Sequence, residues 1–412
     1  MDRDARADLL EIYRHAVAAV NGRVRVRAHL AGREPGAPVR VIAVGKAAGP
    51  MALGACDALG AGVESALVIT KYGHAAAGFP AGLPLTVIEA GHPLPDANSL
   101  RAGRDLLDFI ARAPAASAFL FLVSGGASAL VEAPAGALQL ADLQRAHRWL
   151  TGCGRDIAAI NRVRTRLSLI KGGRLAMHLG GRRTLQLLIS DVAGDDPAVI
   201  GSGLLSPADT SGPPERGLPA WLAELAGGAP APPAADAPCF RTVETRLIAC
   251  ARDARLAAAG HARELGYAVR LHHGLITGDA AGEGRRLARV LRDDGTVLHI
   301  WSGETVVTLP ETPGRGGRCQ QLALAAAAEL AGLPGRVLLA AGTDGGDGPG
   351  LAAGALVDGG TVARGQARGL DPLDCLRRAD AGAFLEASGD LIHTGASGTN
   401  VMDLLLAWNG AG

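Results

Sequence analysis

The sequence predicts an α/β protein with two domains, of which the first contains a mostly parallel sheet with helices on both faces. Three observations support this fold class. The chain has 412 residues, enough for more than one hydrophobic core. It is 48% apolar and rich in glycine, with 58 glycines, yet only 3% aromatic. Short apolar runs alternate with stretches of helical composition, the pattern of parallel βαβ units.

Composition and charge exclude several classes of protein. The formal net charge is +1, and no long block of one sign occurs, so we expect no nucleic-acid partner. The charged start of the chain lacks the apolar segment of a signal peptide, and no apolar stretch is long enough to span a membrane. The six cysteines form no C-x-x-C pair, which indicates reduced thiols. We therefore predict a cytoplasmic protein with no membrane contact.

The first domain is expected to cover residues 1–235. Five apolar runs predict its strands, at residues 39–44, 66–70, 85–90, 118–123 and 185–190. Helices are predicted between and before them, at residues 8–28, 50–59, 98–113, 138–151 and 156–179. Residues 206–238 are rich in Pro, Ala and Gly and are interpreted as a linker with one helical patch near Leu222.

The second domain is expected to cover residues 236–412 and to be a smaller α/β unit. Strands are predicted at residues 245–250, 267–271, 297–301 and 336–341, with 306–309 as a hairpin partner. Helices are predicted at residues 254–265, 279–291, 319–331 and 401–408.

The candidate binding loops all follow predicted strands of the first domain. The most distinctive is Ser124-Gly125-Gly126-Ala127-Ser128, where free backbone N–H groups at a strand-to-helix turn can bind an anion. Ligands of parallel sheets sit beyond the carboxyl ends of the strands. Every other candidate of this domain lies at such an end, namely Gly45-Lys46, Lys71, His92-Pro93 and Asp191 to Asp196.

Lysine occurs at only three positions, 46, 71 and 171, in a chain with 41 Lys and Arg residues. The contexts of Lys46 and Lys71 favour a compact cation that holds an anionic oxygen, whereas Lys171 is interpreted as a chance occurrence. Neither a G-x-x-x-x-G-K-[ST] loop nor a G-x-G-x-x-G fingerprint is present, so the two commonest nucleotide motifs are excluded.

The second domain supplies complementary groups. Arg315 and Arg318 lie in a glycine-rich stretch before a predicted helix and can neutralise phosphoryl charge. Asp344 and Asp347 lie on another glycine-rich loop and could hold hydrated Mg²⁺, although an Asp-Gly turn without metal explains them equally well. The histidines at positions 74, 92 and 393 lack metal-ligand spacing, and hydrogen-bonding roles are favoured.

Anion-binding loops with Lys and Arg and nearby carboxylates form the set of groups that phosphoryl transfer requires. The strings that carry a more specific resemblance are Val44-Gly45-Lys46-Ala47, Gly91-His92-Pro93-Leu94-Pro95-Asp96, Ser124-Gly125-Gly126-Ala127-Ser128-Ala129-Leu130, Ser190-Asp191-Val192-Ala193-Gly194-Asp195, Gly316-Gly317-Arg318, Gly342-Thr343-Asp344-Gly345 and Thr394-Gly395-Ala396-Ser397-Gly398-Thr399-Asn400. In this order, and over nearly the whole chain, they resemble the glycerate 2-kinase family, which combines an N-terminal Rossmann-like domain with a C-terminal MOFRL domain.

The resemblance implies ATP- and Mg²⁺-dependent phosphorylation of D-glycerate to 2-phosphoglycerate in a cleft between two α/β domains. It places the catalytic lysine and arginine at Lys46 and Arg318. For substrate or phosphate binding we expect Gly45, Lys71, Ser124, Gly125, Gly126, Ser128, Asp191, Thr399 and Asn400. Asp344 and Asp191 are the expected metal ligands, D-glycerate and a nucleotide are the expected partners, and a homodimer is left open.

Three positions depart from the family pattern. Cys319-Gln320-Gln321 stands where the family has Asn-Gln-Glu, Ser302-Gly303-Glu304-Thr305 has one glycine where two are usual, and Met402 replaces an asparagine. Two alternatives to a kinase are therefore kept. One is an NAD(P)H-dependent hydroxypyruvate reductase, a name given to older members of the family, and the other is a catalytically impaired paralogue that only binds its ligand.

Overall fold

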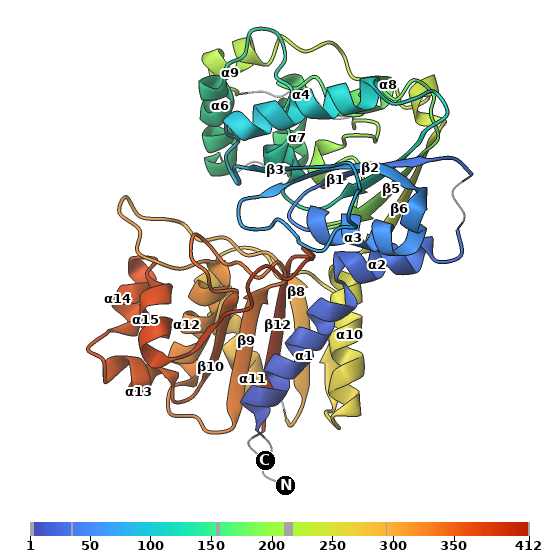
Figure 1. The fold of residues 1–412 in the computed structure, drawn as a ribbon. Helices are drawn as coiled ribbons and strands as arrows, with labels where there is room; N and C mark the ends of the chain where they lie inside the picture. Colours follow the sequence, from blue (N-terminus) through green and yellow to red (C-terminus); the bar gives the residue numbers. More distant parts are fainter. Residues whose placement is uncertain (1–3, 34–35, 154–156, 210–216, 294, 411–412) are drawn as a thin grey trace. The chain divides into compact units, whose positions relative to one another are not determined.

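The computed structural model describes residues 4–33, 36–153, 157–209, 217–293 and 295–410 (Figure 1). The chain divides into two compact units. The first unit is Asn21–Ile248, and the second unit joins Met1–Val20 to Ala249–Gly412. Two α/β units confirm the predicted fold class.

The first unit is built on a six-stranded sheet with the order β3-β2-β1-β4-β5-β6. Its strands are β1 (Val39–Val44), β2 (Val63–Lys71), β3 (Leu85–Ala90), β4 (Ala118–Val123), β5 (Thr184–Ile189) and β6 (Val243–Ala249). Strands β1 to β5 pair in parallel. β1 and β4 lie at the centre in register from Val39↔Ala118 to Val44↔Val123, so the loops that follow them emerge side by side.

Both faces of this sheet are covered by helices (Figure 1). The helices of the unit are α2 (Gly22–Leu30), α3 (Ala48–Leu59), α4 (Ala97–Ala111), α5 (Ala127–Leu130), α6 (Leu140–Gly152), α7 (Ile157–Arg166), α8 (Arg174–Met177) and α9 (Ala220–Leu225), with 3₁₀ turns η1 (Gly60–Gly62), η2 (Ile200–Ser202) and η3 (Pro238–Phe240). Ile42 and Val44 of β1 belong to the core under α4, while α3 packs on β1 and β2. Because alternate residues of a strand face opposite ways, a strand buried on both sides is apolar throughout.

The second unit contains a mixed six-stranded sheet with the order β11-β10-β9-β12-β8-β7. Its strands are β7 (Val269–Leu271), β8 (Leu298–Gly303), β9 (Arg336–Gly342), β10 (Gly354–Asp358), β11 (Leu391–Ile392) and β12 (Asp403–Asn409). β12 lies between β9 and β8 and is antiparallel to both, whereas β7 and β8 are parallel.

Two helical layers enclose this sheet. The helices are α1 (Ala5–Ala19), α10 (Ala251–Glu264), α11 (Ala280–Asp293), α12 (Arg318–Leu330), α13 (Thr361–Gln366), α14 (Pro372–Arg377) and α15 (Ala381–Ser388). Leu404 and Leu406 of β12 pack in the core formed with α1 and α10. Leu405 and Ala407 face the opposite core, formed with α11, α12 and α15.

Several sequence-based expectations differ from the structure. The single helix expected over 8–28 is two helices, because Asn21 begins a new one by accepting a hydrogen bond from the Arg23 N–H at 2.9 Å. The helix expected over 401–408 is the strand β12, and the segment 245–250 belongs to β6 of the first sheet instead of the second. Residues 306–309 form no named strand; Val306 makes only an isolated bridge with Asp279.

The boundary between the two units also differs from the one expected from the sequence, which was placed between residues 235 and 236. β6 extends the first sheet, so the first unit continues to Ile248. α1, which precedes that unit in the chain, packs on α10, β9 and β12 of the second unit. Leu9, Ile12, Tyr13 and Ala16 form its apolar face, and they are buried there.

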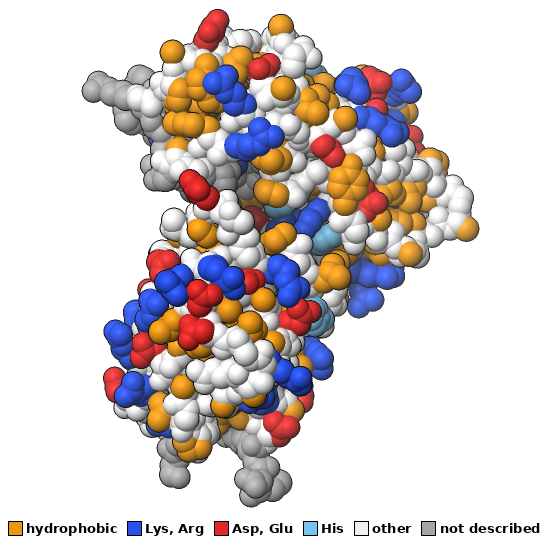
Figure 2. Space-filling view, turned by 90° about the vertical axis from the view of Figure 1, so that its left-hand side faces the viewer, with side chains coloured by type: hydrophobic (Ala, Val, Ile, Leu, Met, Phe, Trp, Pro, Cys, Tyr) orange, Lys and Arg blue, Asp and Glu red, His pale blue; other side chains and the backbone are white. Residues whose placement is uncertain are grey.

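Basic and acidic side chains are interspersed on the face shown in Figure 2, in keeping with the net charge of +1. Among the described helices, none is both long and apolar enough to cross a lipid bilayer.

Candidate functional site

The loops after β1 and β4 are joined directly by hydrogen bonds. The Lys46 N–H donates to the Gly125 carbonyl at 2.9 Å, and the Ser124 Oγ accepts from the Ala47 N–H at 3.0 Å. Gly45 has φ +130°, and a Cβ there would lie 2.2 Å from the Ser124 Oγ, so no larger residue fits. Ser124 is fully buried, which gives its side chain the task of holding the two loops together.

Lys46 leaves this junction next to Gly126 and His92. A Cβ placed on Gly126 would lie 3.2 Å from the His92 Nε2 and 3.3 Å from the Lys46 Cγ. The His74 Nδ1 lies 3.3 Å from the Lys46 carbonyl oxygen. The structure thus brings Lys46, Gly125 and Gly126 together at the carboxyl edge of the sheet, with two histidines beside them.

Ser128 belongs to a chain of three polar side chains. Its Oγ is 2.8 Å from the Ser202 Oγ, and the Ser202 hydroxyl donates to the Asn161 Oδ1 at 3.1 Å. The Asn161 Nδ2 donates to the Val199 carbonyl at 3.3 Å, which fixes the orientation of the amide. Since the one hydroxyl hydrogen of Ser202 is used, Ser128 must donate to Ser202. The Ser128 Oγ then keeps lone pairs that can accept a hydrogen bond, which suits a ligand hydroxyl better than a phosphate oxygen.

Lys71 and Asp191 lie at the same edge of the sheet, at the ends of strands β2 and β5, which are separated by β1 and β4. Lys71 is the last residue of β2 and Asp191 follows β5 after one residue, and both side chains are half-buried. Asp196, further along the Asp191 loop, caps a short turn by accepting from the Ala198 N–H at 2.8 Å. A hollow of about 250 Å³ lies between this loop and α7, with Asn161 and Asp196 among its lining residues.

Glu132, His147, Arg164 and Lys171 form a buried charged cluster in the first unit. Lys171 and Glu132 form an ion pair in which both side chains are inaccessible to solvent. Lys171 is thus not a chance occurrence, because it neutralises a buried carboxylate. Burial lowers the pKa of His147 to about 2, helped by the Lys171 and Arg164 charges, so this histidine is neutral at pH 7.

In the second unit, Arg318 begins α12 and is held by two carboxylates. Its Nε and Nη2 donate to Asp403 at 2.6 and 2.9 Å, and its Nη1 is 2.7 Å from Glu304. Burial alone would lower the pKa of Arg318, but the Asp403 and Glu304 carboxylates more than offset this and raise it above its ordinary value. Arg318 is a permanent, oriented cation.

The two candidate metal ligands of the Asp-Gly loop have different environments. Asp347 accepts hydrogen bonds from the Cys319 and Gln320 N–H groups at 3.0 and 2.8 Å and from the Gln320 amide, so it caps α12. Burial raises the pKa of Asp347 to about 6, and the Asp403 charge adds to this. Asp344 makes a more local contact, accepting from the Gly346 N–H at 3.0 Å, and is the better candidate ligand of the two.

The predicted ligand-binding residues Thr399 and Asn400 lie in the loop before β12. The Thr399 hydroxyl is buried and donates to the Val20 carbonyl at the end of α1, at 2.7 Å. Its side chain therefore anchors the loop to α1. Gly345 and Gly395 make a close backbone approach, since a Cβ on Gly345 would lie 1.9 Å from the Gly395 oxygen. Asn400 is also buried.

Among the residues that the structure describes, no group of three or more His, Cys, Asp or Glu side chains could hold a metal ion. Mg²⁺ in kinases is usually bound by one or two carboxylates together with phosphates of the ligand, a type of site that does not require such a group.

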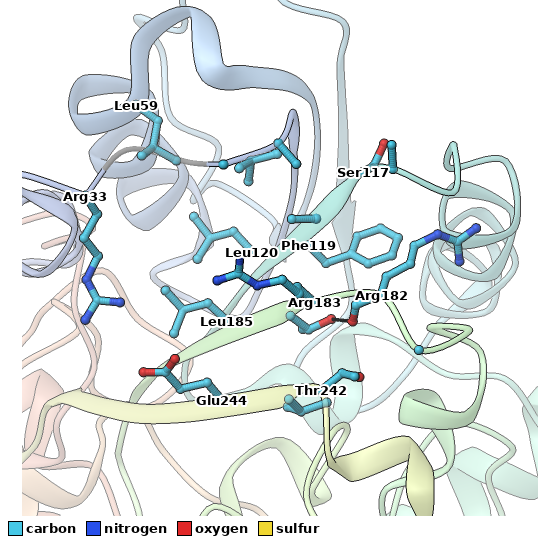
Figure 3. A pocket seen from close by; sticks show the side chains of 18 of the residues that line it. Arg33, Leu59, Ser117, Phe119, Leu120, Arg182, Arg183, Leu185, Thr242 and Glu244 are labelled. Atoms are coloured by element: carbon cyan, nitrogen blue, oxygen red, sulfur yellow. Dashed lines mark hydrogen bonds between the residues drawn. The ribbon is translucent and has the colours of Figure 1, made fainter.

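A second hollow of the first unit lies at the opposite edge of its sheet. Its volume is about 810 Å³, and it is lined by the amino ends of β1, β4 and β5 together with side chains such as Arg33, Arg183 and Glu244 (Figure 3). The carboxyl ends of α2 and α3 reach this hollow at Leu30 and Leu59. Since a helix carries partial negative charge there, the arginines complement the helix ends. None of the predicted site residues lines it.

Sequence reasoning missed Asn161, Ser202, Asp403 and the buried charged cluster. Ser202 stands between Gly201 and Gly203 and has φ +58°, a conformation that marks a constrained turn. Asp403 lies in the segment 401–408, which was predicted to be a helix, so its role was not predicted. Within the buried charged cluster, Lys171 stood out as one of only three lysines, but its significance was missed. The other residues gave no local signal, because their partners lie far away in the chain.

Comparisons with known proteins identify two family regions. Residues 8–214 match a domain family described as a domain of unknown function, and residues 297–403 match the MOFRL family. A D-glycerate 2-kinase of Thermotoga maritima is 36% identical over 378 residues, covering 89% of this chain and 90% of that protein. A glycerate 2-kinase of Pyrococcus horikoshii is 33% identical, covering 90% and 87%.

One further relative and one solved structure extend this comparison. A protein of Agrobacterium vitis named as a putative hydroxypyruvate reductase is 35% identical, covering 98% of this chain and 94% of its own. The crystal structure of a glycerate kinase from Thermotoga maritima has a TM-score of 0.81 at 33% identity, covering 98% of this chain and 99% of that one.

Proposed function

Because the chain belongs to the glycerate kinase family, we propose that it is a kinase that transfers the γ-phosphoryl group of ATP to the 2-hydroxyl group of D-glycerate. The observation that carries the proposal is the junction of the loops after β1 and β4. There Lys46, Gly125 and Gly126 are held together at the carboxyl edge of a parallel sheet, and the Ser124 Oγ, as a hydrogen-bond acceptor, joins the two loops.

We assign the positive charges to the phosphoryl group. Lys46 would neutralise the transferring oxygens, and Arg318, fixed by Asp403, would stabilise the charge that develops in the transition state. The N–H groups of Gly125 and Gly126 are suited to an anion, because no Cβ obstructs its approach. Lys71, Ser128 and Asp191 are proposed to contact the acceptor.

Mg²⁺ is proposed to bind Asp344 together with nucleotide phosphates, and Asp191 is a second candidate. Asp347 does not fit this role well, because its carboxylate is committed to the N-terminus of α12. When bound, the ion would neutralise phosphate charge and help to align the β- and γ-phosphates.

The substitution Asn to Cys at position 319 does not argue for an inactive paralogue. Cys319 is buried, and burial together with the Asp403 and Asp347 carboxylates raises the pKa of its thiol well above the ordinary value. The thiol is therefore protonated and buried against protein atoms.

The test is an assay of the purified protein with D-glycerate, ATP and Mg²⁺, in which the product is identified by phosphorus NMR. Phosphate on carbon 2 couples to one proton and phosphate on carbon 3 couples to two, so a doublet is expected and a triplet would move the reaction to the 3-hydroxyl. Oxidation of NADH with hydroxypyruvate, in the absence of phosphorylation, would replace the proposal with a reductase.

The first prediction concerns Lys46. Lys46→Ala should lower kcat by at least about 100-fold, because the transition state loses a charge-assisted contact. Arg112→Ala serves as the control, since Arg112 is a highly exposed residue that forms a surface ion pair with Asp108. A Lys46→Ala protein that retains the wild-type kcat would remove Lys46 from the mechanism.

A further inference from the structure

The face of α7 that reaches the Ser128 chain also carries an arginine. Asn161 lies on α7 and accepts from Ser202, which in turn accepts from Ser128. Arg164 follows Asn161 by three residues, and residues at this spacing lie on the same face of a helix. Arg164 is therefore one turn away from the residue that α7 uses to contact the candidate site.

The guanidinium of Arg164 lacks a dedicated carboxylate. Its Nε is inaccessible to solvent and has no hydrogen-bond partner in the described part of the chain, while the side chain as a whole stays partly accessible. Burial lowers the pKa of Arg164, and Glu132 is the acidic group that opposes this effect. That carboxylate is already paired with Lys171, although its Oε1 has no hydrogen-bond partner either.

The charges of the buried cluster do not balance. Arg164 and Lys171 are positive, Glu132 is negative, and His147 is neutral at pH 7 because its pKa is about 2. The cluster therefore carries one excess positive charge. Burying a cation without a partner destabilises the fold, and a bound anion can compensate that cost.

We propose that Arg164 binds the carboxylate of the acceptor and makes the enzyme specific for a hydroxy acid. This inference rests on the proposed function. A guanidinium and a carboxylate are geometrically matched, and one excess charge matches one carboxylate, whereas a nucleotide triphosphate carries several charges. Ser128 lies on the same hydrogen-bond chain and can accept a hydrogen bond from a hydroxyl group of the same ligand.

The test measures D-glycerate binding by calorimetry without nucleotide, so it does not depend on turnover. Arg164→Gln should raise the Kd for D-glycerate roughly 10- to 100-fold, the usual effect of losing a charge-assisted hydrogen bond. Arg164→Lys should lose part of the affinity, because an ammonium cannot bind bidentately. The Kd for ATP should be unchanged in both variants.

A neutral analogue and a surface variant provide the controls. Glyceramide, which has no carboxylate, should bind wild type and Arg164→Gln with equal affinity. Arg148→Gln, which replaces the exposed neighbour of His147 on α6, should leave D-glycerate binding unchanged. Melting temperatures of all variants identify those that fold. If Arg164→Gln does not fold, Arg164→Lys, which keeps the charge, provides the test instead.

Two negative outcomes are distinguishable. If wild type phosphorylates D-glycerate but the folded Arg164 variants bind it as tightly as wild type, the assignment of Arg164 is wrong and the proposed function stands. If wild type binds D-glycerate through Arg164 but forms no phosphorylated product, the proposed kinase activity is wrong and the assignment of Arg164 stands. If wild type does not bind D-glycerate, the inference about Arg164 is overturned.

Discussion

At the scale of single residues, Asp403 is the residue that orients Arg318. It binds the Nε and Nη2 of the guanidinium from a strand in the middle of the sheet, and its side chain is only 5% exposed. Glu304, the second partner of Arg318, is 47% exposed and can be replaced by a ligand or by water. The two carboxylates therefore differ in function. Asp403 fixes the guanidinium of Arg318, whereas Glu304 contacts its remaining nitrogen, Nη1.

We predict that Asp403→Asn lowers kcat by roughly 10- to 100-fold while Arg318 stays charged, because an amide cannot accept both N–H groups in the same way. Glu304→Gln should change kcat by less than about threefold, since its exposed ion pair contributes little. Steady-state kinetics with saturating ATP would compare the two. Equal effects of both substitutions would show that Asp403 has no special role in positioning.

A pH-dependent prediction follows from Asp347. The pKa of an aspartate is ordinarily 3.8, and that of Asp347 is about 6 in the folded protein, so the folded state binds a proton more readily than the unfolded state. The contribution of Asp347 to the free energy of unfolding is thus largest below pH 3.8 and is lost as the pH rises to about 6.

The difference in unfolding free energy between wild type and Asp347→Asn should accordingly fall as the pH rises through this window. Urea titrations at several pH values measure it. A pH-independent difference would mean that Asp347 is ionised at the same pH in the folded and unfolded states.

At the scale of elements, the Glu132–Lys171 pair joins the segment after α5 to the segment before α8. The Glu132 N–H donates to the Ser99 carbonyl on α4, and the Gly172 N–H donates to the Ser202 carbonyl in η2. The pair thus fixes the backbone on both sides of the Ser128 chain. Loss of Glu132 leaves Lys171 buried and unpaired beside the like charge of Arg164.

Glu132→Leu should therefore lower the free energy of unfolding by about 3–5 kcal/mol, whereas adding Lys171→Met should recover most of this loss. Denaturant unfolding of both variants and of wild type measures the coupling. An additive double variant, as unstable as the sum of the single changes, would show that the pair is not energetically coupled.

The elements also explain what could be predicted from the sequence. The strands β1 to β5 and the loops after them were predictable, because buried parallel strands are short apolar runs that end in glycine-rich turns. β12 was not, because a strand buried on both faces lacks alternation and its leucines and alanine also favour helices. Because β12 was predicted to be a helix, neither the position of Asp403 nor its role in orienting Arg318 could be predicted.

Long-range partners limited the rest of the site prediction. Lys46, Gly125 and Gly126 were placed together correctly, since parallel strands end at one edge. The hydrogen bond between Ser202 and Asn161 joins residues 41 positions apart, and the Glu132–Lys171 pair joins residues 39 positions apart. Neither spacing has a periodicity that a local pattern could reveal.

At the scale of the whole molecule, α1 connects the two units through the chain while it packs in only one of them. Its apolar face is buried with α10 and with the strands β9 and β12 of the second unit. The Tyr13 hydroxyl donates to the Gly342 carbonyl at 2.7 Å, next to the loop that carries Asp344. The stability of that loop therefore depends on residues that precede the first unit.

Ile12→Ala should destabilise the second unit by about 2–5 kcal/mol, because it leaves a cavity at a fully buried position. Hydrogen exchange followed by mass spectrometry should show faster exchange in β9 and β12 and unchanged exchange in β1 and β4. Faster exchange in β1 and β4 alone would contradict the assignment of α1 to the second unit.

The position of β12 has a consequence for the order in which the chain folds during synthesis. β12 lies between β9 and β8, yet its residues, 403–409, are translated long after both of these strands. Until they leave the ribosome, β8 and β9 each present an open edge, and the sheet of the second unit exists as two separate pieces. The nascent second unit therefore exposes unpaired strand edges until β12 inserts, whereas all six strands of the first unit have already been translated.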